Sequence, residues 1–403
     1  SEEMKSILLL GGSRQQVPAI ETAKRLGYRT VLIDYLSENP GQFVADKWYQ
    51  ESTTDVESVY RIAKDEQVSG ILAYASDPAA FPAALVCERL GLPTNPVKAV
   101  EILGVKHKFR EFLKENSFAC PATFTFSPAT SLVEVQQGIE NMRFPIVVKP
   151  TDSSGSKGVS FLNDSGSLAT AITYADCYSR NKILIAEEFI ERIYPYVIGG
   201  DIFVESGKIV LFGDMECLRG DHGKSLIPIG EKRPNGLSDR QKKRLYSELQ
   251  RLVDALNVRF GEFNIEVLVG RDDSIHFLEV GPRAGGNMIP IQLSDAFGVD
   301  LIEANIKICM GESVELNPVS AKGAFMTYVL HSNVDGIFSG ISIAPELKSA
   351  VYRQVIYKRQ GDRVEAFDGA GKAVGIVFLH FSDKSAMDLA EIDIESKILV
   401  DVL

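Results

Sequence analysis

Two glutamates in neighbouring apolar segments are the residues best placed to hold a metal ion. Residues 263–269 and 275–280 are predicted to form the two strands of a hairpin. If its turn centres between residues 272 and 273, Glu266 lies directly opposite Glu279. Facing carboxylates repel each other, and a bound cation removes that penalty, with Mg²⁺ or Mn²⁺ favoured by oxygen ligands. In the alternative, one glutamate is out of register or solvated.

The segment after Glu279 carries groups that suit an anionic substrate. Arg283 is a permanently charged donor four residues beyond that glutamate. It can stabilise charge on a transferring phosphoryl group or hold a substrate carboxylate. Gly285 and Gly286, followed by Asn287, can form a backbone nest for an anion. We predict that Arg283 is catalytic and that it binds substrate together with these three residues.

A run of small and polar residues at 151–159 can fold over phosphates. Glycines let backbone N–H groups approach an anion closely, and serine hydroxyls add donors. The run lacks the Gly-x-x-x-x-Gly-Lys-[Ser/Thr] pattern of a P-loop. Strands are predicted on both sides, at 144–150 and 160–162, so a loop between two strands is expected, with an ordinary hairpin loop as the alternative. Lys149 before the run and Lys106 in an earlier helical segment can each neutralise a phosphate.

Residues 1–97 alternate between apolar runs and helical segments, which predicts a parallel sheet with right-handed crossovers. Such a sheet binds ligands beyond the carboxyl ends of its strands, where Gly11-Gly12-Ser13, Asp34 and Ser76-Asp77 fall. The glycines do not match Gly-x-Gly-x-x-Gly, so an NAD-dependent oxidoreductase is only an alternative. The predicted strands are 6–12, 29–34 and 70–74, and the predicted helices are 18–27, 56–67 and 79–90.

The remaining chain predicts two further regions. Residues 98–116 are predicted to form one helix, and Ser238 is predicted to cap an amphipathic helix at 239–257. Strand-like runs joined by turns near the C-terminus indicate a smaller β-rich domain. The expected fold class is α/β and α+β, multidomain. The expected domains are 1–97, an α/β domain; 98–312, with lobes at 98–186 and 187–312; and 313–403, the β-rich domain.

Taken in order, these elements resemble the ATP-grasp superfamily of carboxylate–amine ligases over nearly the whole chain. The stretch 144–150, Phe-Pro-Ile-Val-Val-Lys-Pro, followed by the serine- and glycine-rich run, is a very close match. The resemblance also rests on the two glutamates, on Arg283 as the arginine of the family's Asn-Pro-Arg, on the hinge Glu187-Glu188-Phe189-Ile190, and on Lys106 with Arg110, Leu113 and Pro121.

The resemblance implies a Rossmann-like N-terminal sheet, a two-subdomain ATP-grasp clamp and a small C-terminal domain similar to that of biotin carboxylases. The implied cofactors are ATP and Mg²⁺ or Mn²⁺, with Glu266 and Glu279 as metal ligands. The 153–158 loop is implied to cover the phosphates, and the hinge to meet adenine or ribose. The implied ATP-binding residues are Lys106, Lys149, Ser153, Ser154, Gly155, Ser156, Gly158, Glu187, Glu188, Phe189 and Ile190.

The chain departs from the family pattern near the metal and near the ribose. The family has Glu-x-Asn-Pro-Arg where this chain reads Glu279-Val280-Gly281-Pro282-Arg283. Gly281 supplies no asparagine oxygen, so a second metal ion is expected to take a water ligand in its place. Gly199-Gly200-Asp201 replaces the family's Gly-x-Glu-x-Ser, which leaves the ribose contact open. Val105 replaces the aspartate that precedes the family's lysine.

The implied reaction is an ADP-forming ligation that makes a C–N bond. ATP phosphorylates a small-molecule carboxylate to an acyl phosphate, and an amine then displaces phosphate. Dipeptide-type ligation of amino acids fits this chemistry. A phosphoribosylamine–glycine ligase of purine synthesis is an alternative, although its Glu-x-Asn-x-Arg-x-Gly-Asp-Pro-Glu signature is absent. A non-catalytic ATP-binding protein on the same fold is another.

Composition and net charge limit the classes of molecule that this protein is expected to bind. The formal net charge of −11 disfavours binding to nucleic acid or to an anionic membrane surface. No apolar run approaches the roughly 18 residues that span a bilayer, and the cysteines and histidines show no zinc-type spacing. We expect a cytoplasmic enzyme that acts on small-molecule carboxylate and amine substrates, and a homodimer because related enzymes are often dimers.

Overall fold

A computed structural model of the protein describes residues 3–152, 157–190, 197–220, 227–270 and 272–403. The chain divides into two compact units: unit 1 comprises residues 1–116 and 194–403, and unit 2 comprises residues 117–193. The predicted mixed, multidomain fold class is confirmed, because a parallel sheet and antiparallel sheets, one of them with eight strands, occur in one chain. Among the described residues, no helix is long and apolar enough to cross a membrane.

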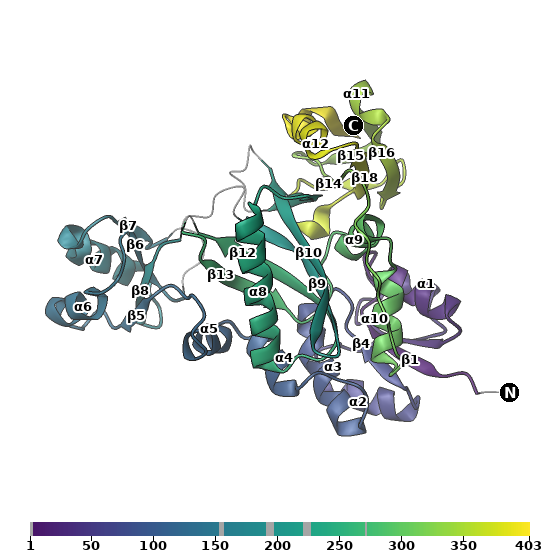
Figure 1. The fold of residues 1–403 in the computed structure, drawn as a ribbon, viewed down its shortest axis with the longest axis horizontal. Coiled ribbons are helices and arrows are strands. Elements are labelled where there is room, and N and C mark those ends of the chain that lie inside the picture. The colour runs from purple at the N-terminus through teal and green to yellow at the C-terminus, as the bar shows by residue number, and fades with distance from the viewer. Residues whose placement is uncertain (1–2, 153–156, 191–196, 221–226, 271) are drawn as a thin grey trace. The chain divides into compact units, whose positions relative to one another are not determined.

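Unit 1 begins with the predicted parallel sheet, which is confirmed (Figure 1). Ile7 and Leu9 of the first strand pack in one core with the helix at 17–25, whereas Leu8 and Leu10 pack in another with the helices at 56–65 and 77–90. Both faces of the first strand are therefore covered, which explains its continuous apolar run. The strand order is β3 (Lys47–Tyr49), β2 (Arg29–Ile33), β1 (Ser6–Leu10), β4 (Gly70–Leu72), and the helices are α1 (Val17–Arg25), α2 (Val56–Asp65) and α3 (Asp77–Leu90).

The prediction of one helix over 98–116 is wrong. The segment forms two helices, α4 (Val97–Gly104) and α5 (Lys106–Glu115). The break falls at Val105, whose backbone is extended at φ −120° and ψ 111°. An extended residue interrupts the helical hydrogen-bond ladder, and a β-branched valine adopts this conformation readily. As a consequence, Lys106 is the first residue of a helix rather than part of a helix interior.

An eight-stranded antiparallel sheet forms the centre of unit 1, in the order β13-β12-β9-β10-β11-β14-β18-β16. Three C-terminal strands thus extend the sheet that carries both predicted metal ligands. The strands are β9 (Val197–Glu205), β10 (Lys208–Arg219), β11 (Pro228–Arg233), β12 (Gly261–Val269), β13 (Ile275–Gly281), β14 (Ala324–Leu330), β16 (Val351–Ile356) and β18 (Gly375–Phe381).

Helix α8 (Asp239–Leu256) lies along one face of this sheet, which we call the α8 face (Figure 1). The ring of Tyr246 on α8 stacks on that of Phe212 on β10, with centroids 4.2 Å apart. The predicted cap is confirmed: the Ser238 side chain accepts a hydrogen bond from the Gln241 N–H, and the two residues form a capping box.

Helices α9 (Ile289–Phe297) and α10 (Leu301–Cys309) cover part of the opposite face, which we call the α9 face. Phe203 of β9 and Met215 of β10 pack there in one core with Leu293 of α9. Side chains alternate between the two faces along each strand. Residues two apart from Phe203 or Met215 therefore also point to the α9 face.

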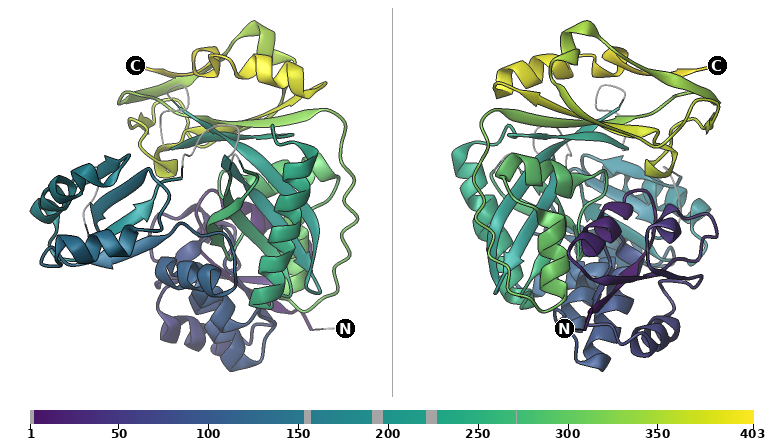
Figure 2. Two further views of the ribbon diagram at one scale, coloured as in Figure 1. Left: turned by 60° about the vertical axis from the view of Figure 1, so that its left-hand side comes forward. Right: turned by 90° about the vertical axis from the view of Figure 1, so that its right-hand side faces the viewer.

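The C-terminal segment builds a further layer beside the end of the large sheet, in yellow and light green in Figure 2. Its three-stranded sheet has the order β17 (Arg363–Val364), β15 (Gly336–Ile343), β19 (Ile398–Val402). Helix α12 packs against β14 and β18, and the shared apolar core ties the layer to the large sheet. The helices of this layer are α11 (Pro345–Lys348), α12 (Lys384–Glu391) and α13 (Ile394–Lys397).

Unit 2 is a four-stranded antiparallel sheet in the order β5-β8-β6-β7, with two helices. Its core contains Ile146, Val148 and Leu184. Strands β6 and β7 pair directly, so the run at 151–159 joins two paired strands, as predicted. The elements are β5 (Thr123–Phe126), α6 (Leu132–Ile139), β6 (Ile146–Pro150), β7 (Ser160–Leu162), α7 (Leu168–Tyr178) and β8 (Leu184–Glu188).

Candidate active site

The register of β12 and β13 places Glu266 directly opposite Glu279, which confirms the predicted pairing. A β-bulge follows at once, because the next pair joins Val267 to Phe277. Directly opposite residues point to the same side of an antiparallel sheet. That side is the α9 face, because Glu262, on the same strand and side as Glu266, pairs with Phe203.

The two carboxylates fit a hard divalent cation. Glu266 is half-buried and Glu279 is exposed, so both belong to a surface that a ligand can reach. Carboxylate oxygens are the donors that Mg²⁺ and Mn²⁺ prefer, and phosphate and water oxygens typically complete the shell. No group of three or more His, Cys, Asp or Glu side chains that would hold a metal ion occurs in the described part of the chain. The pair therefore suits an ion shared with phosphate.

Arg283 is held by Asp77, the first residue of helix α3. Its Nε donates to Oδ1 of Asp77 at 2.7 Å, and its Nη2 donates to Oδ2 at 2.6 Å. Burial lowers the pKa of Arg283, but the hydrogen bonds and charge of Asp77 outweigh burial and raise the pKa overall. Two parallel bonds fix the plane of the guanidinium. The sequence placed Asp77 at a strand end that binds ligands, but gave no sign that it holds Arg283.

Gly281, which replaces the family's asparagine, makes room for this ion pair. A Cβ at Gly281 would lie 3.0 Å from Cζ of Arg283 and 3.1 Å from Oδ1 of Asp77. Both distances are tighter than ordinary van der Waals contact, so a larger residue would push the ion pair apart. The departure from the family motif therefore accompanies a clamped arginine.

The predicted substrate loop is anchored at both ends. The N–H of Gly285 donates to Oδ2 of Asp201 at 2.9 Å, and the N–H of Asn287 donates to the side chain of Gln15 at 2.8 Å. A Cβ at Gly286 would lie 3.3 Å from the same Gln15 oxygen. The buried Oδ1 of Asn287 has no hydrogen-bond partner among the described residues. An unpartnered buried acceptor in a substrate loop is suited to a ligand donor.

Asp201 and Glu262 form a buried carboxyl pair next to this loop. Burial raises the pKa of Glu262 well above its usual value, and the charge of Asp201 raises it further. Burial also raises the pKa of Asp201, although bonds from Glu262, Gly285 and Asn264 oppose that rise. Burial thus raises the pKa of both carboxyls, and Asp201 accepts the hydrogen bond that anchors the loop at Gly285.

Lys106 is exposed at the start of α5. Val105 occupies the N-cap position and forms no side-chain cap, because valine has no oxygen to accept from the first N–H groups. The aspartate of the family pattern would supply that acceptor. This departure therefore affects the beginning of the helix that carries Lys106.

Within unit 2, Lys149 lies on β6 opposite Ile185 and is partly exposed. Gly158 has φ +77°, a left-handed conformation that favours glycine, and a Cβ there would lie 2.9 Å from Pro150. The backbone thus requires glycine at this position, whereas its role toward ATP stays a prediction. The other predicted loop residues, Ser153, Ser154, Gly155 and Ser156, lie outside the described residues.

The two hinge glutamates have different surroundings. Glu188 uses both carboxylate oxygens inside unit 2: Oε1 accepts from the N–H of Ala122 at 2.8 Å and Oε2 from the N–H of Arg143 at 3.0 Å. Glu187 lies on β8 opposite Val147 and is partly exposed. Which of the two meets adenine or ribose stays a prediction.

The end of the hinge is apolar. Phe189 contacts Phe161 edge to face, with ring centroids 5.1 Å apart, and both side chains are exposed. Ile190 beside them is partly exposed. Exposed aromatic and aliphatic side chains at this point are suited to contact a planar base.

The model of the family described as carbamoyl-phosphate synthase L chain, ATP binding domain, matches residues 106–317, more than half of the chain. The chain belongs to this ATP-grasp family. The matched segment contains both glutamates and Arg283. The predicted relationship to ATP-grasp carboxylate–amine ligases is therefore confirmed.

A carbamoyl phosphate synthase large chain from Thermotoga sp. (strain RQ2) is 25% identical over 298 residues, which cover 72% of this chain and 26% of that one. The present chain thus spans about a quarter of the length of this carbamoyl phosphate synthase large chain. A phosphoribosylglycinamide synthetase from Anaerococcus prevotii superposes with a TM-score of 0.85 at 18% identity, with 100% of each chain covered. An L-amino acid ligase from Bacillus licheniformis gives 0.76 at 17%, also with 100% of each covered. These likenesses establish the fold.

Proposed function

We propose that this chain is an ADP-forming ligase that activates a small-molecule carboxylate as an acyl phosphate and joins it to an amine. One observation carries the proposal: Glu266 faces Glu279, with Arg283 clamped directly after them, in a chain of the ATP-grasp family. Facing carboxylates cost stability in a sheet. Their presence on the α9 face is explained if they hold a cation together with nucleotide phosphates.

The proposed nucleotide is ATP, with Glu266 and Glu279 holding Mg²⁺ or Mn²⁺. When bound, the ion neutralises charge on the transferring phosphates. Lys106 and Lys149 add positive charge to bind the nucleotide, and one of the hinge glutamates, Glu187 or Glu188, meets its adenine or ribose. All of these groups belong to the segment that the ATP-binding family model matches.

Arg283 is proposed to hold the substrate carboxylate and then the acyl phosphate. Its Nε and Nη2 face Asp77, and Nη1 donates to the carbonyl of Ala284 at 3.2 Å. The end-on edge formed by Nη1 and Nη2 points away from Asp77 and suits an anion. Because the guanidinium is already oriented, little reorganisation is needed when charge develops.

The test is ADP release from Mg-ATP by the full chain, with pools of amino acids and of small carboxylates, and with Glu279→Gln as the blank. Release that needs one pool and disappears in the variant supports the ligase. Adding glycine with phosphoribosylamine tests the purine alternative. Near-normal release by Glu279→Gln contradicts the metal pair, and ATP binding without release from any pool favours a non-catalytic nucleotide-binding protein.

A further inference from the structure

Glu231 is a buried carboxyl that the proposed reaction does not yet use. It lies on β11 and is 4% exposed, and its Oε2 has no hydrogen-bond partner among the described residues. Leaving a buried polar atom unsatisfied costs about 1–3 kcal/mol. An oxygen kept in that state therefore needs an explanation, and a ligand donor is one.

Glu231 points to the same face of the sheet as the glutamate pair. It lies opposite Cys217 of β10, and Cys217 is two residues from Met215, which packs on the α9 face. Its Oε2 lies 3.5 Å from the point where a Cβ at Gly199 would sit, and Sγ of Cys217 lies 2.7 Å from that point. The side chain of Glu231 thus extends across β10 toward β9.

Gly199 separates Glu231 from the predicted metal ligands. The register of β9 and β12 places Gly199 across from Glu266. Because glycine has no side chain, the position between the two glutamates is bordered by the Oε2 of Glu231 and the sulfur of Cys217. A Cβ at 199 would lie only 2.7 Å from that sulfur, so a larger residue would have to displace the Cys217 side chain.

The backbone of Glu231 is fixed by two buried polar side chains. Its N–H donates to Oγ1 of Thr327 at 3.1 Å, and its carbonyl accepts from Nε2 of Gln292 at 3.0 Å. Thr327 in turn donates to Oε1 of Gln292 at 3.1 Å. These bonds come from β14 and α9, so the carboxyl is presented from a rigid support.

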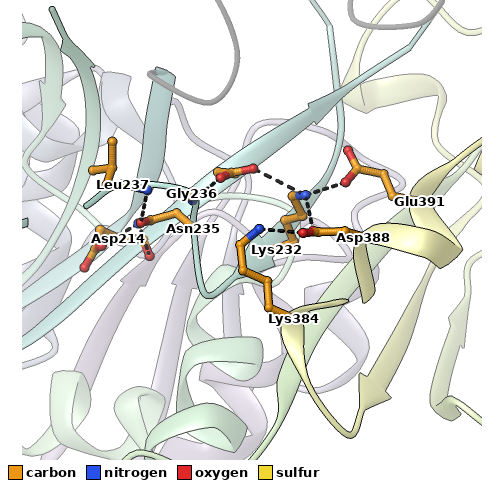
Figure 3. Close-up of polar contacts among 9 residues, drawn as sticks. Asp214, Lys232, Asn235, Gly236, Leu237, Lys384, Asp388 and Glu391 are labelled. Carbon is orange, nitrogen blue, oxygen red and sulfur yellow. Dashed lines mark hydrogen bonds and ion pairs between the residues drawn. The ribbon is translucent and has the colours of Figure 1, made fainter. Parts of the chain in front are cut away.

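On the α8 face, the same two strands carry charged side chains that form ion pairs within the protein. Lys232 lies opposite Glu216, at 3.4 Å between Nζ and Oε2, and also pairs with Asp388 and Glu391 of α12 (Figure 3). Every charge there has an opposite partner within the protein. Oε2 of Glu216 also lacks a hydrogen bond among the described residues, but its charge is balanced by the ion pair with Lys232. Glu231 is buried to a similar degree and has no ion pair among the described residues.

The surroundings of Glu231 favour a cation. Burial is the main cause that raises the pKa of Glu231, to about 8. A hydrogen bond with the Cys217 thiol and the charge of Arg219 lower the pKa, and the charges of Asp201 and Glu266 raise it further. Two carboxylates and one guanidinium thus act on this carboxyl. A positive ligand placed beside Gly199 would relieve both the burial penalty and the repulsion.

We propose that Oε2 of Glu231 binds the ammonium group of the amine substrate at the position beside Gly199. The inference rests on the proposed ligase function, which needs an amine near the activated carboxylate. An ammonium group is small and carries only donors, which matches a lone acceptor over a glycine. A metal ion fits less well, because no group of three ligating side chains is found around Glu231 in the described part of the chain.

The test measures binding without turnover. Isothermal titration calorimetry on the full chain with Mg-ADP compares amino acids with their 2-hydroxy analogues, such as alanine with lactate and glycine with glycolate. Each pair differs only in the ammonium group. We expect at least one amino acid to bind the wild type about tenfold or more tightly than its analogue. In Glu231→Gln, that preference should disappear.

Glu216→Gln is the matched control, because it removes a buried carboxylate from the opposite face of the neighbouring strand. It should keep the preference for the amino compound, and thermal melting should show that both variants fold. A preference that survives in Glu231→Gln overturns the proposal. So does a wild type that binds every amino acid no better than its hydroxy analogue.

The two hypotheses fail in different ways. If the ligase proposal alone is wrong, amino compounds bind through Glu231 but no pool gives ADP release. If the Glu231 proposal alone is wrong, ADP release depends on an amine and its KM for that amine is unchanged by Glu231→Gln.

Discussion

On the α8 face of strands β10 and β11, Glu216 lies opposite Lys232, and the lysine is surrounded by carboxylates from the sheet and from α12 (Figure 3). On the α9 face, one residue along each strand, Cys217 lies opposite Glu231, which keeps an unpartnered oxygen among the described residues. Both glutamates are buried to a similar degree. Burial alone therefore does not assign a role: charges that are paired inside the protein hold elements together, and charges left over are suited to ligands.

The largest effect on stability is expected from removing Lys232, which pairs with three carboxylates on the α8 face. Lys232→Met leaves Glu216 buried without its cation and removes the bridge to α12. Losing one partner of a buried ion pair costs about 3–5 kcal/mol, so urea unfolding should show a loss of that size. Lys384→Met is the control. The Lys384 side chain, which pairs with Asp388, is 36% exposed, and an exposed pair contributes only about 0–1 kcal/mol. Equal losses in the two variants would contradict the comparison.

On the α9 face, removing a carboxylate should leave stability intact and reduce activity. Glu279→Gln relieves repulsion with Glu266, so the melting temperature should not fall. ADP release should drop by about 10²–10³-fold, because charge stabilisation of the phosphates is lost. Steady-state kinetics beside thermal melting measures both. A variant that melts much earlier than the wild type would give this pair a structural role.

A smaller effect is expected when the clamp on Arg283 is removed. Asp77→Ala should lower kcat/KM by about tenfold, because the guanidinium loses its fixed plane, and Asp77→Asn should lower it less. Gly281→Asn should be tolerated better in the Asp77→Ala background, since one of its three close contacts is then gone. Additive losses in the double variant would show that Gly281 and Asp77 are independent.

A further effect concerns the dependence of stability on pH. The pKa of Glu231 is raised from 4.5 to about 8 in the folded protein, so the unfolded chain releases this proton first. The cost of burying the carboxyl therefore grows as the pH rises from about 4.5 to 8 and is constant above. Glu231→Gln should match the wild type near pH 4.5 and be more stable at pH 8.5 by urea unfolding. An advantage that is largest at low pH would have the wrong sign.

Local patterns predicted much of the fold. The apolar runs of the first strands predicted a parallel sheet, and Ser238 predicted the start of α8, because both signals act within a few residues. The pairing of Glu266 with Glu279 was predicted for the same reason: a short turn fixes the register of a hairpin. The break at Val105 was missed because the helical pattern continues through it and only the backbone conformation reveals it.

By itself, the sequence determined the chemistry available to this protein: two facing carboxylates, an arginine beside them, and lysines and a serine- and glycine-rich run in the ATP-grasp order. Only the tertiary structure decided how some of these groups are held. Asp77 forms an ion pair with Arg283, 206 residues away in the chain. Oε2 of Glu231 lies 3.5 Å from the point where a Cβ at Gly199 would sit, across an intervening strand. Such contacts depend on the packing and register of segments far apart in the chain, and residue spacing carries no signal for them.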